Sequence, residues 1–379
     1  MTDSSPSLPT AIAPGRVNLL GEHVDYNGGP VLPAAIDRAV RLAYLPRSDR
    51  QVYLRARDLN TGVVFDLDHL VDRQDIAGQP LPTWALYPAG VAWALSRKGL
   101  EVRGLEGEFT STVPIGAGLS SSAAVELAFS VAWRTLGGWE ADPLELARLC
   151  QRAENQYVGV NCGLMDQFAS ACGVEDHALY FDTRSLVWRP VPLPPSVVIV
   201  IADSGVRRSL ANSAYNERRA ACEQAVALLQ PYLPGVTTLR DVTPEEFNRL
   251  ADHLPELVRK RARHVVEECA RVDEAIQCLD RGDGAAFGRL MFAGHASLRD
   301  LYEVSIPELD LLVELAGSLP GCLGARLTGA GFGGCTVNLV EEQHAEEFIQ
   351  RLAAGYRAPG REAQVYLCRA SRGAHIRGE

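Results

Sequence analysis

The segment VPIGAGLSSSAAVELAFSVAW, residues 113–133, places a glycine-rich turn directly before a long apolar helix. Gly116 and Gly118 allow the backbone to turn tightly, so that successive N–H groups converge where the helix begins. The serines from Ser120 to Ser122 open that helix, and the positive end of the helix dipole favours an anion there. Such a turn is either a phosphate-binding loop or an ordinary serine cap, and the segment alone does not distinguish them.

The chain length of 379 residues exceeds what one hydrophobic core usually supports, so we expect two domains. A proline-rich break, VWRPVPLPPS, precedes the strand-like run VVIVIADSG, whose β-branched residues are typical of a buried strand. This break places the boundary near residue 185. The expected domains are therefore residues 1–185 and residues 186–379.

The pattern of secondary structure differs between the two halves. Residues 30–67 alternate short apolar runs with turns, which predicts an antiparallel meander, and helices are predicted at 84–99 and after Asp142. In the second half, long helical patterns are grouped between the strand-like runs GARLTG, CTVNLV and AQVYLCR. Helices grouped in this way favour an α+β fold over a doubly wound sheet.

Composition argues against several classes of protein. The formal net charge is −10, and the basic run RKRARH at 259–264 lies in a helical pattern, where a solvated helix face is a better interpretation than a nucleic-acid site. No stretch approaches the roughly 18 apolar residues of a membrane span, and the N-terminus lacks a leader pattern, so we expect a cytoplasmic protein. The nine cysteines include no C-x-x-C pair, which predicts reduced, mostly buried thiols. Neither lysine, Lys98 or Lys260, lies in a Walker loop.

Two further segments combine glycine with unusual chemistry. PGRVNLLGEHVDYNGG, residues 14–29, contains a cation, two carboxylates, a histidine and a tyrosine. LTGAGFGGC, residues 327–335, has four glycines within six positions, which is more than a two-residue hairpin turn requires. Either a ligand approaches this backbone closely, or the connection packs tightly on a neighbouring loop.

In this order and at these separations, PGRVNLLGEHVDYNGG, PIGAGLSSSAAVEL and LTGAGFGGC resemble the three motifs of the superfamily of galactokinases, homoserine kinases, mevalonate kinases and phosphomevalonate kinases. The first motif is similar to that of galactokinases, and the resemblance extends to NCGLMDQFAS at 161–170 and SLANSAYNERRAACEQA at 209–225. It implies an α+β fold of two domains. The N-terminal domain would have a mixed sheet, like the second domain of ribosomal protein S5, and the C-terminal domain a ferredoxin-like core. ATP and a sugar would meet in the cleft between them.

The resemblance also implies which residues bind the nucleotide and its metal ion. Ser122 and Glu154 would be the ligands of Mg²⁺, since a hydroxyl and a carboxylate, completed by water, suit a hard octahedral cation. Without the resemblance, Glu154 would be interpreted as an exposed helix carboxylate. The ATP phosphates would lie on the loop formed by Gly116, Ala117, Gly118, Leu119, Ser120, Ser121 and Ser122.

Asp166 matches the family's catalytic aspartate, whose proposed role is to accept the proton of the anomeric hydroxyl. Arg16 matches the arginine that stabilises the transferring phosphate and pairs with that aspartate. Phosphoryl transfer depends on positioning and charge neutralisation more than on covalent chemistry. Because a guanidinium makes its partner carboxylate a weaker base, Asp166 would orient the hydroxyl, deprotonate it, or do both. An Arg-Asp pair across a cleft can also be purely structural.

The first motif would recognise the sugar, because selecting one epimer requires polar groups that the wrong isomer leaves unpaired. By resemblance, Glu22 and Asp25 accept hydrogen bonds from sugar hydroxyls, and His23 adds a further contact. Val24 stands where many members have threonine and would contribute its backbone. Tyr215 matches a tyrosine of the second domain that also contacts the sugar, although an ordinary amphipathic helix would carry it equally well.

The activity that the resemblance implies is ATP-dependent phosphorylation of galactose at its C1 hydroxyl, giving α-galactose 1-phosphate and ADP. One alternative is a related kinase that acts on N-acetylgalactosamine or arabinose, against which the galactokinase-like segment NGGPVLPAAID argues. Another is a non-catalytic galactose sensor, but the serine-rich loop is complete, and Arg16 and Asp166 are both present. We expect a monomer without an obligate protein, nucleic-acid or membrane partner.

Overall fold

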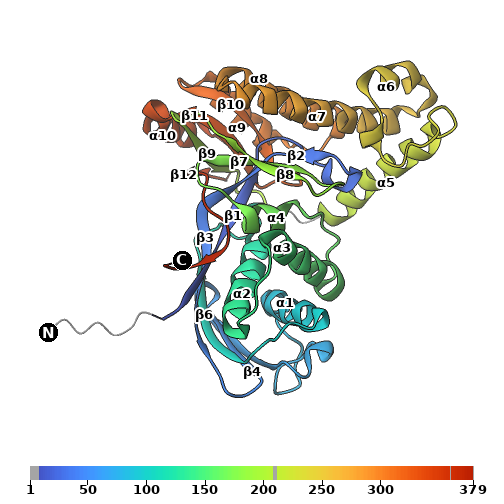
Figure 1. Cartoon of the computed structure of the whole chain (residues 1–379). Helices are drawn as coiled ribbons and strands as arrows, with labels where there is room; N and C mark the ends of the chain where they lie inside the picture. The colour runs from blue at the N-terminus through green and yellow to red at the C-terminus, as the bar shows by residue number, and fades with distance from the viewer. Residues whose placement is uncertain (1–7, 208–210, 359, 379) are drawn as a thin grey trace.

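The structure is a computed structural model that describes residues 8–207, 211–358 and 360–378. Two predictions fall partly outside these ranges. They concern the N-terminus, of which residues 1–7 are not described, and the family-like segment 209–225, of which residues 209 and 210 are not described. Figure 1 shows two parts, a lower one with a curved sheet and an upper one with a second sheet and long helices. The predicted α+β organisation is therefore confirmed.

The lower part is built on a six-stranded sheet in the order β13-β1-β3-β6-β4-β5. Its strands are β1 (Thr10–Asn18), β3 (Pro33–Pro46), β4 (Gln51–Ala56), β5 (Thr61–Asp66), β6 (Leu105–Ser111) and β13 (His375–Ile376). The sheet is mixed, since β4 and β6 run parallel and the other pairs antiparallel. The antiparallel meander predicted for residues 30–67 is wrong, because β6 lies between β3 and β4. Alternation of apolar residues identifies a strand but not its partner.

Helices cover one face of this sheet (Figure 1). They are α1 (Thr83–Lys98), α2 (Ser121–Gly137), α3 (Pro143–Arg152) and α4 (Met165–Cys172). α2 and α4 pack on β1 and β3, and α1 and α3 pack against α2. Two helix ends lie where the sequence predicts them. Gly99 follows α1 with a left-handed φ of 84°, and Asp142 caps α3 by accepting the N–H of Leu144 at 2.8 Å. A π-helical turn, η4 (Ala153–Val158), continues α3.

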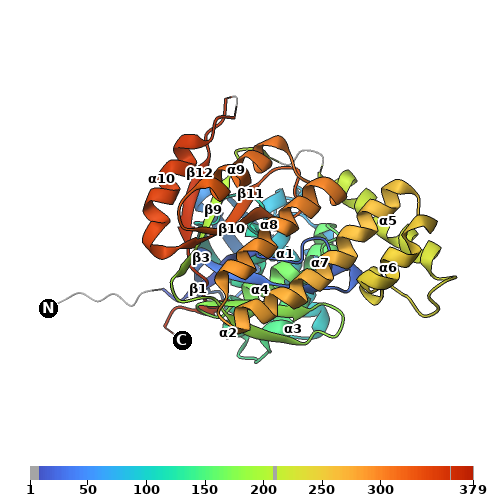
Figure 2. The same cartoon turned by 90° about the horizontal axis from the view of Figure 1, so that it is seen from above.

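The upper part contains an antiparallel sheet in the order β10-β11-β9-β12. Its strands are β9 (Val197–Asp203), β10 (Cys322–Thr328), β11 (Cys335–Glu341) and β12 (Gln364–Cys368). Its helices are α5 (Ala211–Leu229), α6 (Pro244–Leu250), α7 (Glu256–Asp280), α8 (Gly284–Ser297), α9 (Pro307–Ser318) and α10 (Ala345–Gly355). α8 and α9 pack on β10, while α7 extends from α8 toward α5 and α6 (Figure 2).

A three-stranded sheet of β2 (Pro30–Val31), β7 (His177–Asp182) and β8 (Trp188–Pro192) lies between the two parts. The expected boundary near residue 185 falls in the turn between β7 and β8 and stays a prediction. All nine cysteines are free thiols and seven are buried, as predicted. Among the described residues, no helix combines the length and the apolar composition needed to cross a bilayer.

The basic run at 259–264 lies in the first turns of α7, and its side chains point in two directions. Two are buried, Arg261 with 2% and His264 with 0% exposure, so the predicted solvated face is wrong for them. A run of six residues covers more than one helical turn, and part of it must face the core. Three others form surface ion pairs, as a solvated face requires: Arg259, Lys260 and Arg263.

Candidate active site

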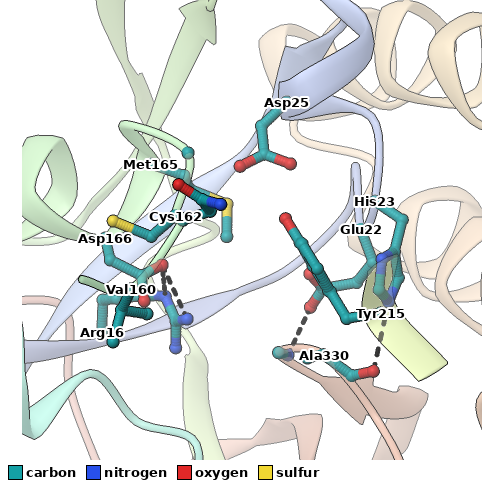
Figure 3. Close-up of a pocket in the computed structure, with 13 residues that line it drawn as sticks. Arg16, Glu22, His23, Asp25, Val160, Cys162, Met165, Asp166, Tyr215 and Ala330 are labelled. Carbon is teal, nitrogen blue, oxygen red and sulfur yellow. Dashed lines mark hydrogen bonds and ion pairs between the residues drawn. The ribbon is translucent and has the colours of Figure 1, made fainter. Parts of the chain in front are cut away.

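One pocket with a volume of ≈ 200 Å³ lies where the first motif, the start of α4 and the third motif meet. Figure 3 shows Arg16 and Asp166 on one side of it and Glu22, His23 and Tyr215 on the opposite side. Residues 160–163 and Met165, together with Gly329 and Ala330, complete the lining. The pocket brings together six of the residues that the sequence assigned to catalysis or sugar binding: Arg16, Glu22, His23, Asp25, Asp166 and Tyr215.

Asp166 is held by partners on both of its carboxylate oxygens. Arg16, on β1, contacts Oδ1 with Nε at 2.9 Å and with Nη2 at 2.7 Å. Ser120 donates its hydroxyl to Oδ2 at 2.6 Å. The Asp166 side chain is nevertheless 31% exposed and faces the pocket, while that of Arg16 is 5% exposed. This arrangement orients a carboxylate toward a bound molecule and leaves it accessible to a hydroxyl proton.

The loop before α2 has the geometry expected of an anion site. Gly116, Gly118 and Ser120 all have left-handed φ angles, of 71°, 81° and 58°, and α2 begins at the next residue. The side chains of Ala117 and Leu119 are buried in the core, so the loop faces the solvent mainly with its backbone. Because the hydroxyl of Ser120 is bonded to Asp166, the loop offers the hydroxyls of Ser121 and Ser122 to other partners.

Arg207 approaches this loop from the other part of the molecule and was not identified from the sequence. A Cβ placed on Gly116 would lie 3.4 Å from Cδ of Arg207. The Nη1 of Arg207 contacts both carboxylate oxygens of Asp203, at the end of β9, at 2.9 Å. A guanidinium is thus held opposite the glycine-rich loop. No local pattern around VRRSL distinguishes this arginine from its neighbours.

Glu22 is 2% exposed, and burial raises the pKa of its carboxyl group, although Arg326 and Arg16 oppose the shift. Its Oε1 accepts the backbone N–H of Gly329 at 2.7 Å, which ties the first motif to the third. Two glycines of the third motif, Gly331 and Gly333, lie against the backbone of neighbouring segments. A Cβ on Gly331 would lie 2.3 Å from the carbonyl oxygen of Val304. The structure thus supports the tight connection as the reason for these glycines.

Asp25 projects into the pocket from the short helix η1 (Asp25–Asn27). Burial, together with the charge of Asp166, raises the pKa of Asp25 to about 6. Its carboxylate lies directly against Gly163: a Cβ added there would be only 1.8 Å from Oδ2 of Asp25. Glycine at position 163 therefore provides the space that this carboxylate occupies.

His23 has a left-handed φ of 63°, which is uncommon for a residue with a Cβ. Its ring nitrogens contact the hydroxyl of Tyr26 at 3.0 Å and the carbonyl oxygen of Ala330 at 3.2 Å. Val24, by contrast, does not line the pocket. Its side chain is fully buried, and its carbonyl oxygen accepts the N–H groups of residues 27 and 29.

Glu154 lies in η4, 6% exposed, and hydrogen bonds connect it to Ser122, Cys162 and Gln167. Burial and the charge of Asp166 raise its pKa to about 7. Ser122 and Glu154 therefore offer neighbouring hydroxyl and carboxylate oxygens at the end of the loop, a donor set that suits Mg²⁺ once phosphate and water oxygens complete it. Among the described residues, no group of three or more His, Cys, Asp or Glu side chains could hold a metal ion unaided.

A second cavity, of ≈ 500 Å³, lies on the other side of the loop. It is mainly apolar, and Ser121 and Ser122 line its edge. The indole N–H of Trp84 is buried and has no hydrogen-bond partner among the described residues. An apolar cavity with an unused donor suits the planar base of a nucleotide. Trp84 and Tyr87 could not be identified from the sequence, because aromatic residues at helical spacing resemble ordinary core positions.

Family models match the chain in three places. The model described as GHMP kinases N terminal domain matches residues 87–174, and that described as GHMP kinases C terminal matches residues 265–358. A galactokinase galactose-binding signature matches residues 3–46. Together these models cover more than half of the chain.

Curated relatives and solved structures agree with these models. A galactokinase of Roseiflexus sp. (strain RS-1) is 50% identical over 362 residues, covering 95% of this chain and 91% of the relative, and one of Chloroflexus aggregans is 46% identical, covering 97% and 93%. The crystal structure of Lactococcus lactis galactokinase complexed with galactose has a TM-score of 0.90 at 36% identity, covering 97% and 94%. Methanococcus jannaschii mevalonate kinase, at 20% identity and a TM-score of 0.71, shares the fold and covers 97% of this chain and 99% of its own. The chain therefore belongs to the galactokinase family and has the two-domain fold of the GHMP kinases.

Proposed function

We propose that this chain transfers the γ-phosphoryl group of ATP to the C1 hydroxyl of galactose, giving α-galactose 1-phosphate and ADP. The observation that carries the proposal is the position of Asp166. Asp166 faces the pocket and is bonded to Arg16 and to Ser120 of the phosphate-binding loop. Its carboxylate therefore lies between the pocket that would hold the sugar and the loop that would hold the phosphates. The galactose bound to the related Lactococcus lactis enzyme supports this choice of sugar.

In the proposed mechanism, Glu22 and Asp25 accept hydrogen bonds from sugar hydroxyls, and Tyr215 closes the pocket from α5. Asp166 orients the C1 hydroxyl and accepts its proton as the new P–O bond forms. Arg16 and the N–H groups at the start of α2 stabilise the negative charge on the transferring phosphoryl group. Arg16 also fixes the loop, because its Nη1 donates to the carbonyl oxygen of Gly118 at 2.7 Å.

The nucleotide would span the loop, with its base in the apolar cavity beside Trp84 and its phosphates on residues 116–122. Ser122 and Glu154 would hold Mg²⁺, which when bound neutralises part of the phosphate charge. The carboxylate of Glu154 is oriented for this by Gln167, whose Nε2 donates to Oε2 at 2.5 Å. The expectations of a monomer and of a cytoplasmic location stay predictions.

Phosphorus NMR of the purified protein with ATP, Mg²⁺ and galactose tests the proposal. Glucose, N-acetylgalactosamine and arabinose are run in parallel. A sugar 1-phosphate signal that depends on galactose is the expected result. A stronger signal with N-acetylgalactosamine or arabinose would identify a related kinase, and binding of ATP and galactose without any product would identify a sensor.

Replacing Gly163 with alanine is expected to weaken galactose binding at least about tenfold, because the added methyl group takes the place of the Asp25 carboxylate. The backbone of Gly163 does not have a positive φ, so the fold should be retained. Calorimetry measures the galactose affinity. Gly317→Ala is the matched control, since its Cβ would meet only the Phe292 ring at 3.4 Å. Equal galactose affinities in the two variants would contradict the role of Gly163.

Galactose affinity is expected to fall below about pH 6. Asp25 accepts hydrogen bonds from the sugar only as a carboxylate, and its pKa in the free protein is raised to about 6. The dissociation constant should therefore be flat above about pH 7 and should rise about tenfold between pH 7 and pH 5, most of it below pH 6. Calorimetry at each pH measures this, and Asp25→Asn should bind weakly without the step near pH 6. A step of unchanged size in Asp25→Asn would assign the titration to another group.

A further inference from the structure

A chain of hydrogen bonds leads from the pocket into residues that do not line it. The hydroxyl of Tyr26, which contacts Nδ1 of His23, lies 2.6 Å from the hydroxyl of Tyr302. The Sγ of Cys222 lies 3.4 Å from the same oxygen of Tyr302. Tyr26 belongs to η1, Cys222 to α5, and Tyr302 to the π-helical turn η7 (Leu298–Tyr302). The chain thus joins three segments that are far apart in the sequence.

The contact between His23 and Ala330, at one end of this chain, determines which group donates in each hydrogen bond. The Nε2 of His23 contacts the carbonyl oxygen of Ala330, which can only accept, so Nε2 carries a proton. In the neutral imidazole Nδ1 is then an acceptor. Tyr26 must therefore donate to His23, Tyr302 must donate to Tyr26, and the thiol of Cys222 donates to Tyr302. With a neutral His23, every hydroxyl proton in the chain therefore has one defined place.

The ring of Tyr302 also lies between two histidines that hold the first motif. Its centroid is 4.8 Å from that of His23 and 4.5 Å from that of His264. His264 is fully buried, and its Nε2 donates to the carbonyl oxygen of Glu22 at 3.1 Å. Tyr302 therefore supports both the backbone of Glu22 and the ring of His23.

This support acts where the backbone is strained. His23 keeps its left-handed φ only because its surroundings hold it, and in the chain it lies between Glu22 and Asp25, two of the three carboxylates of the pocket. Tyr215 depends on the same cluster, since its ring centroid is 5.6 Å from that of His23 and 5.3 Å from that of Tyr26. We propose that Tyr302, acting through Tyr26, is a positioning residue for sugar recognition, which fixes His23 and Tyr215 without contacting the sugar. The inference rests on the proposed function.

The variant Tyr302→Phe tests it, because phenylalanine keeps the ring packed between the two histidines and removes only the hydroxyl. The dissociation constant and the KM for galactose should rise about fivefold to tenfold, while the KM for ATP and the kcat stay within about twofold. Tyr356→Phe is the matched control. It also removes a buried hydroxyl, one that donates to the carbonyl oxygen of Ser204 at 2.9 Å, and galactose binding should not change.

Two further measurements separate positioning from general stability. Tyr26→Phe should weaken galactose binding as well, and the double variant should be no weaker than Tyr26→Phe alone, because one break already interrupts the chain. Nitrogen NMR of the histidine rings should show that His23 carries a proton on Nε2 only. The His23 signals are assigned by their disappearance in the variant His23→Gln. The Nδ1 signal should shift in Tyr26→Phe.

The inference is overturned if Tyr302→Phe binds galactose within twofold of the unmodified protein, or if its KM for ATP rises as much as that for galactose. Additive effects of the two tyrosine variants would also contradict it. Failure of the proposed function gives a different result, because the unmodified protein itself would then form no galactose 1-phosphate.

Discussion

Replacing Asp166 with asparagine is expected to lower kcat by about 10²–10⁴-fold, the range that a positioned proton acceptor contributes. Asparagine has the same size, and its carbonyl oxygen can still accept a hydrogen bond from Arg16, so the pocket should keep its shape. Galactose and ATP affinities, measured by calorimetry, should stay within a few-fold of those of the unmodified protein. Steady-state kinetics with saturating substrates measures the loss in kcat.

The control for this variant is Asp252→Asn, which changes a fully exposed carboxylate in a surface ion pair with Arg259. It should leave kcat unchanged. A kcat for Asp166→Asn within tenfold of normal, with the fold intact, would show that the carboxylate does not take the proton. Asp166 would then act only by orienting the hydroxyl.

Replacing Arg16 with alanine is expected to lower kcat by about 10³-fold or more, because an arginine that stabilises the charge of a transferring phosphoryl group contributes on this scale. The guanidinium has three roles here. It holds Asp166 with two nitrogens, it fixes the loop at Gly118, and it faces the pocket from a side chain that is 5% exposed. Single-turnover kinetics measures the chemical step directly.

Arg16→Lys is the matched variant, since lysine keeps the charge but cannot make the paired contacts of a guanidinium. It should recover part of the rate, and added guanidinium ion should partly rescue Arg16→Ala. A kcat within tenfold of normal in Arg16→Ala would falsify the role in catalysis. The pair with Asp166 would then be purely structural.

Local features of the chain were predictable where a few neighbouring residues decide the conformation. Gly99 and Asp142 mark helix ends because a left-handed cap and an N-cap carboxylate act within one turn. The loop before α2 was predictable for the same reason, since its glycines and the helix start lie within seven residues. The motifs and their order predicted the remaining site residues, including the pocket residues from Arg16 to Tyr215.

Pairing between strands and the second cavity were not predictable in this way. β6 pairs with both β3 and β4, although residues 30–67 are typical of a meander. Trp84 and Tyr87 line the second cavity, yet their spacing is that of any amphipathic helix. Periodicity shows which side of an element is apolar, but it does not show what that side contacts.

The sequence by itself determined the elements, the glycine-rich loop before α2 and the family, because backbone preferences and short motifs depend on adjacent residues. Only the tertiary structure decided how the polar groups are used. The hydroxyl of Ser120 binds Asp166, 46 residues away, and Gly331 of the third motif makes room for the backbone of Val304. Tyr302, 276 residues from Tyr26, completes the chain of donors behind His23. Such contacts follow from how distant elements pack against one another, and no local pattern specifies that packing.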